Sequence, residues 1–180
     1  ILDTSSYRLG ICCGKVMHQK CSIQLHGAKS LSFETRFSCP MCRAPAVAEG
    51  SKECIERLEK WVALGKSWAQ FALAGMYARG LGVKEDPKRA FELLKLAADQ
   101  GHHLSQNNVA NRLTEGQGVV QSDSRAFEYY KLSADQGYEY AQFNVGSLYN
   151  NGIGVEQSDT NAVEYYTLAA DQGHTNAPVS

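Results

Sequence analysis

The side chains best suited to chemistry are concentrated in the first quarter of the chain. All six cysteines precede residue 55, and two of the segments that carry them read CCGKVMHQKC and CPMCR, with 17 residues between them. Thiolates and neutral imidazoles are the ligands of structural zinc, and C-x2-C spacing is typical of such sites. We therefore expect a Zn2+ site here. Its candidate ligands are Cys12, Cys13, His18, Cys21, Cys39 and Cys42.

The small size of this cysteine-rich segment also favours metal binding. About 40 residues cannot bury enough apolar surface to fold unaided, so such segments depend on disulfides or on a metal ion. Six cysteines could form a disulfide framework, but the first ten residues have neither the basic start nor the apolar core of a secretory signal. Bound zinc contributes about 10 to 16 kcal/mol in small peptides, so we expect the segment to be unfolded without it.

The composition of the chain excludes two classes of partner. The 180 residues are 43% hydrophobic and 21% charged, with a net charge of -1, which is typical of globular proteins. No apolar run approaches the roughly 20 residues of a membrane span, and no basic excess suggests phosphate binding. We therefore expect neither a membrane nor a nucleic acid as partner. The cysteines end at Cys54, and the basic excess of residues 1–50 gives way to an acidic excess, so a boundary is expected near residues 44–51.

The remainder of the chain repeats with a period of 36 residues. The string DQG occurs three times at this interval, as does GxGV. Such a period indicates stacked supersecondary units. The predicted units are residues 67–102, 103–138 and 139–174, and Asn176, Ala177 and Pro178 match the start of a fourth.

Each unit reads as two antiparallel helices. In the first helix apolar residues recur every four positions, for example at Ala141, Val145 and Tyr149, as on one face of a helix. The GxG supplies a reversal, and an N-cap side chain then begins the second helix. The predicted caps are Asp86, Ser122 and Ser158, and the predicted left-handed stops are Gly101, Gly137 and Gly173. The histidines just after these stops, His102, His103 and His174, are interpreted as loop residues.

An amphipathic helix is expected between the two parts of the chain, within residues 51–66. Ile55, Leu58, Trp61 and Val62 could pack on the first hairpin, so that the helix caps the stack. Cys54 lies outside the zinc spacing and is expected to be a buried apolar residue of this helix.

The repeats resemble the Sel-1-like repeat family, which is related to tetratricopeptide repeats. The match to A-x-x-x-L-G-x-x-Y-x-x-G-x-G-V is best at Ala141, Val145, Gly146, Tyr149 and Gly152. The resemblance implies a mostly α protein, with an α-solenoid of antiparallel helical hairpins.

A solenoid of this kind usually binds a protein partner on an extended concave face and has no catalytic site of its own. Amide side chains on that face could bond a peptide backbone, although the simpler interpretation of Asn108 and Asn144 is that they are solvated residues typical of their repeat position. The residues expected to line the partner-binding groove are Phe71, Asn108, Asn111, Arg112, Asn144 and Ser147.

Residues 1–45 resemble part of a RING-type zinc finger. CPMCR matches the last cysteine pair of that family, and Cys13, Lys15, His18 and Cys21 occupy its middle positions. The resemblance implies one zinc on Cys13, Cys39 and Cys42, with Cys12 or His26 as the fourth ligand. It also assigns His18 and Cys21 to a first site whose opening cysteine pair is absent from this sequence.

A RING finger implies ubiquitin ligase activity without a nucleophile, because it acts by orienting a bound ubiquitin-conjugating enzyme. By this resemblance Pro40 helps to form the docking groove, and Arg43 bridges the conjugating enzyme and ubiquitin. The sequence thus favours a cytoplasmic or nuclear adaptor that recruits a partner through its repeats and a conjugating enzyme through its finger. The alternatives are a scaffold with a purely structural zinc module and, less favoured, a lumenal protein with disulfides.

Overall fold

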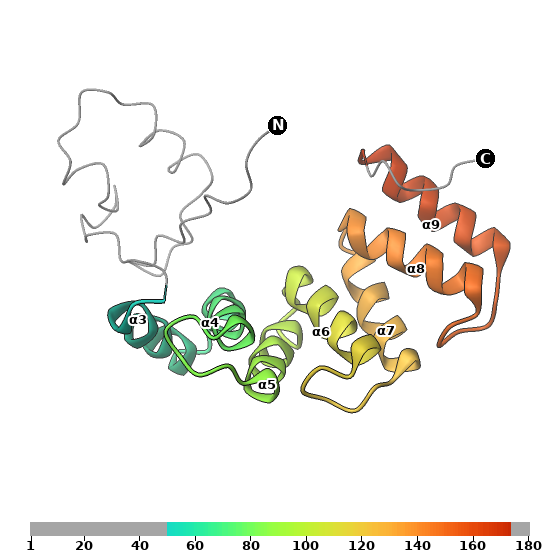
Figure 1. Ribbon diagram of the computed structural model, residues 1–180. Helices are drawn as coiled ribbons and strands as arrows, with labels where there is room; N and C mark the ends of the chain where they lie inside the picture. The colour runs from blue at the N-terminus through green and yellow to red at the C-terminus, as the bar shows by residue number, and fades with distance from the viewer. Residues whose placement is uncertain (1–49, 174–180) are drawn as a thin grey trace, which may run out of the picture. The chain divides into compact units, whose positions relative to one another are not determined.

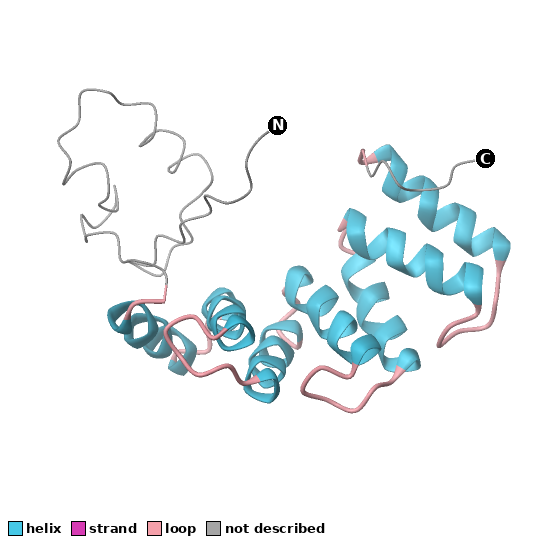
Figure 2. Ribbon diagram, viewed as in Figure 1, coloured by secondary structure: helices cyan, strands magenta, loops and turns pink. Residues whose placement is uncertain are grey.

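The computed structural model describes residues 50–173, and within this range the chain is helical, with no strand (Figures 1 and 2). The prediction of a mostly α repeat protein is confirmed for this part, whereas the expected RING-like module lies outside the described residues. The chain divides into two compact units, residues 1–85 and 86–180. The helices are α3 (Lys52–Ala63), α4 (Ser67–Arg79), α5 (Pro87–Ala98), α6 (His103–Glu115), α7 (Asp123–Ala134), α8 (Glu139–Asn151) and α9 (Asp159–Asp171).

The first unit contains the expected amphipathic helix, α3, packed against α4. The Ser51 hydroxyl caps α3 by accepting a hydrogen bond from the Cys54 amide at 3.2 Å. Cys54 is buried and is not in a disulfide, as expected for an apolar residue of this helix, and Ile55 and Leu58 are buried with it. Trp61 is only half-buried, and its ring lies 5.9 Å from that of Trp68 on α4.

In the second unit, α6 packs with α7 and α8 packs with α9, as the hairpin pattern predicts. Neighbouring hairpins meet through α5 with α6 and through α7 with α8. The facing positions are small: Ala110, Ala126 and Ala141 are fully buried. Alanine at such positions lets helix axes approach toward the close end of the usual range of about 8 to 10 Å.

Glycine is required at two kinds of position in the turns after α6 and α8. Gly116 and Gly152 end these helices in the left-handed region, with φ of 69° and 64°. Gly118 and Gly154 also have positive φ, and a Cβ there would collide with the carbonyl oxygens of Pro87 and Asp123 respectively. The GxG motif therefore combines a reversal with a close backbone approach to the start of the preceding second helix.

The helix starts confirm two of the three predicted caps. Asp86 Oδ1 accepts from the Arg89 amide at 2.9 Å, and the Ser158 hydroxyl accepts from the Asn161 amide at 3.3 Å. The prediction for Ser122 is wrong, because its side chain makes no cap bond, although its backbone is extended like that of Ser158.

The interpretation of the histidines as loop residues is wrong for His103, which is the first residue of α6. His102 lies just before the helix and also caps it, because its Nδ1 accepts a hydrogen bond from the Ser105 amide at 3.2 Å. His174 lies outside the described residues.

A ladder of buried glutamines connects successive units. Gln106 Nε2 donates to the Ala98 carbonyl at 3.3 Å, and its Oε1 accepts from Gln136 Nε2 at 2.7 Å. The same pair of bonds recurs one repeat later, where Gln142 takes the place of Gln106. Both glutamines are buried, so these bonds satisfy polar groups that would otherwise be costly. The glutamines recur 36 residues apart in the sequence, and this signal could have identified the ladder.

Candidate protein-interaction surface

The first helices of the second and third repeats bring most of the predicted groove residues together. Asn108, Asn111 and Arg112 lie on α6, and Asn144 and Ser147 lie on α8. Phe71 belongs to α4 in the first unit, where it is half-buried. We use the name asparagine face for the surface of α6 and α8 formed by Asn107, Asn108, Asn111, Asn144 and Ser147.

Asn107 joins the two helices, and the sequence reasoning missed it. Its Oδ1 lies 3.5 Å from Asn144 Nδ2, at the limit of a hydrogen bond. The Asn107 side chain is 7% exposed, and within residues 50–173 its own amide nitrogen donates no hydrogen bond. The equivalent positions in the other repeats are Phe71 and Phe143, so an asparagine interrupting an aromatic position was the signal available.

The other asparagines of α6 are partly satisfied within the hairpin. Asn111 Oδ1 accepts from the Tyr130 hydroxyl of α7 at 2.5 Å, and burial raises the pKa of Tyr130 above its ordinary value. Asn108 Nδ2 donates to the Leu104 carbonyl one turn earlier at 2.7 Å. Each bond uses one polar atom of a carboxamide and fixes its orientation. Among the described residues, Asn108 Oδ1 and Asn111 Nδ2 make no other hydrogen bond and could pair with a ligand.

Arg112 stands where the other repeats have apolar side chains. Its equivalents Met76 and Leu148 are 1% and 8% exposed, whereas Arg112 is half-buried. Loss of solvent lowers the pKa of Arg112, and the nearby Glu115 carboxylate opposes that shift. The guanidinium remains charged, because its ordinary pKa is far above neutrality. The side chain therefore carries a positive charge beside otherwise neutral amides.

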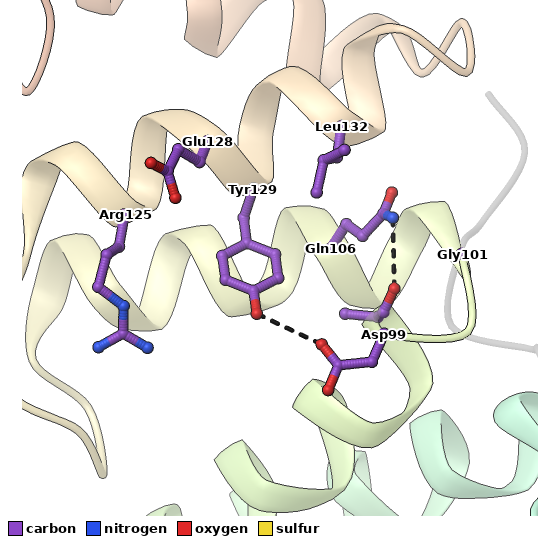
Figure 3. Close-up of a pocket in the computed structure, with 8 residues that line it drawn as sticks. Asp99, Gly101, Gln106, Arg125, Glu128, Tyr129 and Leu132 are labelled. Atoms are coloured by element: carbon purple, nitrogen blue, oxygen red, sulfur yellow. Dashed lines mark hydrogen bonds between the residues drawn. The ribbon is translucent and has the colours of Figure 1, made fainter.

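A shallow groove of about 440 Å³ lies between the end of α5, the start of α6 and α7 (Figure 3). Tyr129 and Leu132 of α7 line one wall, and the Tyr129 hydroxyl lies 3.5 Å from Asp99 Oδ1 at the end of α5. Asp99 also accepts from Lys95 Nζ at 2.7 Å, and this bond raises the pKa of Lys95. These contacts join successive second helices and offer no nucleophile with a positioned base.

The expected zinc chemistry lies outside residues 50–173. In the described part of the chain no three His, Cys, Asp or Glu side chains gather into a group that could hold a metal ion. The predicted ligands and the predicted conjugating-enzyme contacts lie outside the described residues: Cys12, Cys13, His18, Cys21, Cys39, Cys42, Pro40 and Arg43. Among residues 50–173 no helix is long and apolar enough to cross a bilayer.

Stacked helical hairpins of this kind define a helical-repeat scaffold, a class of protein that binds protein partners. The chain belongs to the Sel1 repeat family, which it matches over residues 69–102, 103–138 and 139–174. These bounds agree with the predicted units to within two residues. No curated protein matches the sequence.

Solved structures of other repeat proteins share this fold. A protective antigen of uropathogenic Escherichia coli, c5321, which displays an SLR fold, is 32% identical with a TM-score of 0.65, over 66% of this chain and 26% of its own. A Sel1 repeat protein from Oxalobacter formigenes is 27% identical with a TM-score of 0.67, over 70% of this chain and 52% of its own. Cysteine rich protein B of Helicobacter pylori, 17% identical with a TM-score of 0.55 over 70% of this chain and 90% of its own, shares the fold. The chain thus spans about a quarter and about half of the first two proteins.

Proposed function

We propose that the asparagine face binds an extended peptide segment of a protein partner. A carboxamide carries the same donor and acceptor as a peptide group, so a row of asparagines can pair with a main chain of any sequence. The observation that carries this proposal is the contact of Asn107 with Asn144, which joins the amides of two repeats into one surface. Arg112 adds a charge that would favour a carboxylate at one end of the bound segment.

Selection of short random peptides displayed on phage against the full chain tests the proposal. The double variant Asn108→Ala, Asn144→Ala should bind the selected peptides about tenfold more weakly, since each hydrogen bond contributes about 0.5 to 1.5 kcal/mol. The matched control is Asn150→Ala, an exposed asparagine of α8 outside the face, which should leave binding unchanged. Equal binding by the double variant and the control would reject the asparagine face as the binding site.

We also propose that residues 1–45 bind zinc. The candidate ligands support this proposal. Cys39 and Cys42 have C-x2-C spacing, and they are preceded by further thiols and an imidazole, among them Cys13, His18 and Cys21. When bound, zinc would cross-link a segment too small to fold by apolar burial. Zinc binding requires cysteines that are not in disulfides, so this proposal also favours location in a reducing compartment, the cytoplasm or nucleus.

The RING-like pattern supports a finer proposal, that the finger recruits a ubiquitin-conjugating enzyme through Pro40 and Arg43. Ubiquitin transfer by the full chain with a set of conjugating enzymes tests it. Arg43→Ala should abolish transfer, and Arg36→Ala is the matched control. Absence of transfer with every conjugating enzyme would favour the alternative, a scaffold with a purely structural zinc module.

A further inference from the structure

The helix that carries most of the asparagine face, α6, begins at a histidine cap. His102 Nδ1 accepts a hydrogen bond from the Ser105 amide at 3.2 Å and lies 2.8 Å from the Ser105 hydroxyl. Ser105 is fully buried, so water cannot replace this cap if it breaks. The first helices of the other repeats, α4 and α8, begin after Lys66 and Tyr138, which make no side-chain cap bond. Of the three first helices, only α6 therefore depends on a side-chain cap, and this cap can be protonated.

A positive charge at the start of α6 is unfavourable for two reasons. The first turn of a helix presents unpaired N–H groups and the positive end of the helix dipole, so an imidazolium is destabilised there. Protonation of His102 at Nδ1 would also convert the acceptor of the cap into a donor that faces the Ser105 amide. Burial and the neighbouring His103, whose ring stacks on that of His102 at 5.9 Å, lower the pKa of His102 accordingly.

The neighbouring helices place no described carboxylate in an ion pair with His103. The Ala97 carbonyl of α5 accepts from the His102 amide at 3.2 Å, and the Ser133 hydroxyl of α7 donates to the His103 carbonyl at 2.9 Å. The ring of Tyr138, at the start of α8, lies 5.6 Å from that of His103. Burial raises the pKa of Tyr138, so its phenol stays neutral in acid. The contacts of the His103 ring with α7 and α8 therefore supply no negative charge.

The first turn of α6 also holds the asparagine face in place. Asn108 Nδ2 donates to the Leu104 carbonyl at 2.7 Å, and this bond fixes the carboxamide whose oxygen can pair with a ligand. Asn107, the preceding residue, meets Asn144 of α8. Leu104 lies within the turn that the histidine cap closes, residues 102–105. Opening of this turn would therefore release the Asn108 carboxamide and displace Asn107 from its contact with α8.

We propose that mildly acidic pH releases a peptide from the asparagine face, because protonation of His102 opens the first turn of α6. This inference rests on the function proposed above and adds a means of regulation to the same site. In the open turn His102 has its ordinary pKa of about 6.5, so each pH unit below that value favours opening by up to about tenfold, until the pH reaches the lower pKa of the closed turn. Asparagine does not ionise and arginine stays charged throughout, so no side chain of the face itself titrates in this range.

Fluorescence anisotropy with a phage-selected peptide that contains no histidine tests this inference on the full chain. Kd should be about threefold higher at about pH 5.5 than at about pH 7.5, because only the fraction of chains with a closed turn binds. His102→Asn keeps a cap acceptor that does not titrate, so its Kd should differ little between the two pH values. The matched control is His174→Asn, at the same repeat position two units later, which should keep the dependence of the unmodified chain. Full pH dependence in His102→Asn would overturn the proposal.

Amide hydrogen exchange of the peptide-free chain, followed by NMR spectroscopy, separates this inference from the function on which it rests. The Gln106 amide donates to the His102 carbonyl at 3.0 Å, and the Gln142 amide makes the same bond to Tyr138 in α8. After correction for intrinsic exchange, acid should reduce protection at Gln106 and not at Gln142. Equal loss at both amides, or opening of α6 without a change in Kd, would overturn acid release while leaving peptide binding intact. Absence of peptide binding at neutral pH would instead reject the asparagine face, and acid release with it.

Discussion

Asn107 Oδ1 of α6 lies 3.5 Å from Asn144 Nδ2 of α8, so the second and third repeats meet through two carboxamides. The equivalent position in the other repeats holds phenylalanine, and burying an amide with an unused donor costs about 1 to 3 kcal/mol. A locally unfavourable residue of this kind is typical of a functional surface. The contact therefore supports a binding role for the asparagine face over simple solvation of Asn108 and Asn144.

The Tyr130 hydroxyl should contribute to the stability of the second hairpin. Tyr130→Phe removes its bond to Asn111, so the free energy of unfolding should fall by about 1 kcal/mol. Tyr166 occupies the equivalent position, is equally buried, and makes no hydrogen bond among the described residues, so Tyr166→Phe should change stability little. Urea denaturation of both variants measures the difference, and equal losses would contradict the account.

Gly118 should tolerate substitution less well than Gly137. Both have positive φ, 74° and 85°, so alanine at either position costs about 1 to 2 kcal/mol of backbone strain. Only at Gly118 would the new Cβ meet backbone, at the Pro87 carbonyl, while Gly137 has open space around it. The additional displacement should bring the loss for Gly118→Ala to about 3 kcal/mol or more. Chemical denaturation that ranks the two variants equally would show that the close approach is not rigid.

His102 should make the stability of the chain depend on pH. Burial lowers the pKa of His102 below its ordinary value, and the neighbouring His103 lowers it further. The neutral Nδ1 is the form that accepts the cap bond at the start of α6. The unfolded chain therefore binds the proton more readily. The stabilisation is complete above the unfolded pKa of about 6.5 and is lost as the pH falls toward the lowered folded value.

His102→Asn keeps a cap acceptor without a titrating group, so this variant should lose the difference in stability between neutral and mildly acidic pH. His102→Ala should lose about 1 kcal/mol at neutral pH, where the histidine cap is intact. Thermal denaturation at several pH values measures both effects. An unchanged pH dependence in His102→Asn would assign it to other groups.

Zinc content should depend on Cys39 and Cys42 and not on Cys54. Cys39→Ser with Cys42→Ser should remove bound zinc, because two of four thiolate or imidazole ligands are lost. Cys54→Ser is the control, since Cys54 is buried on α3. Atomic absorption and thiol titration measure the outcome. A full chain with neither zinc nor free thiols would establish the disulfide alternative instead.

Much of the repeat fold could be predicted because its constraints recur every 36 residues. Helix starts, left-handed stops and buried alanines follow from positions such as Asp86, Gly101 and Ala126, where backbone geometry or close packing admits few side chains. The surface was harder to predict. Asn107 was missed because a repeat is recognised by residues that agree between units, whereas this site depends on one that differs.

The capping role of His102 was missed for a related reason. Capping depends on the placement of a single ring nitrogen, which sequence spacing does not report, and the same applies to the unused hydroxyl of Ser122. The zinc ligands remain a prediction, because their evidence is spacing in residues outside the described range.

The central claim, that the asparagine face binds an extended peptide, is tested most directly by NMR spectroscopy of the isotopically labelled full chain with a selected peptide. The account predicts that the side-chain amide resonances of Asn107, Asn108, Asn111 and Asn144 shift together as peptide is added. Shifts confined to residues that line the shallow groove of Figure 3, such as Tyr129 and Leu132, with the four asparagine amides unchanged, would contradict it.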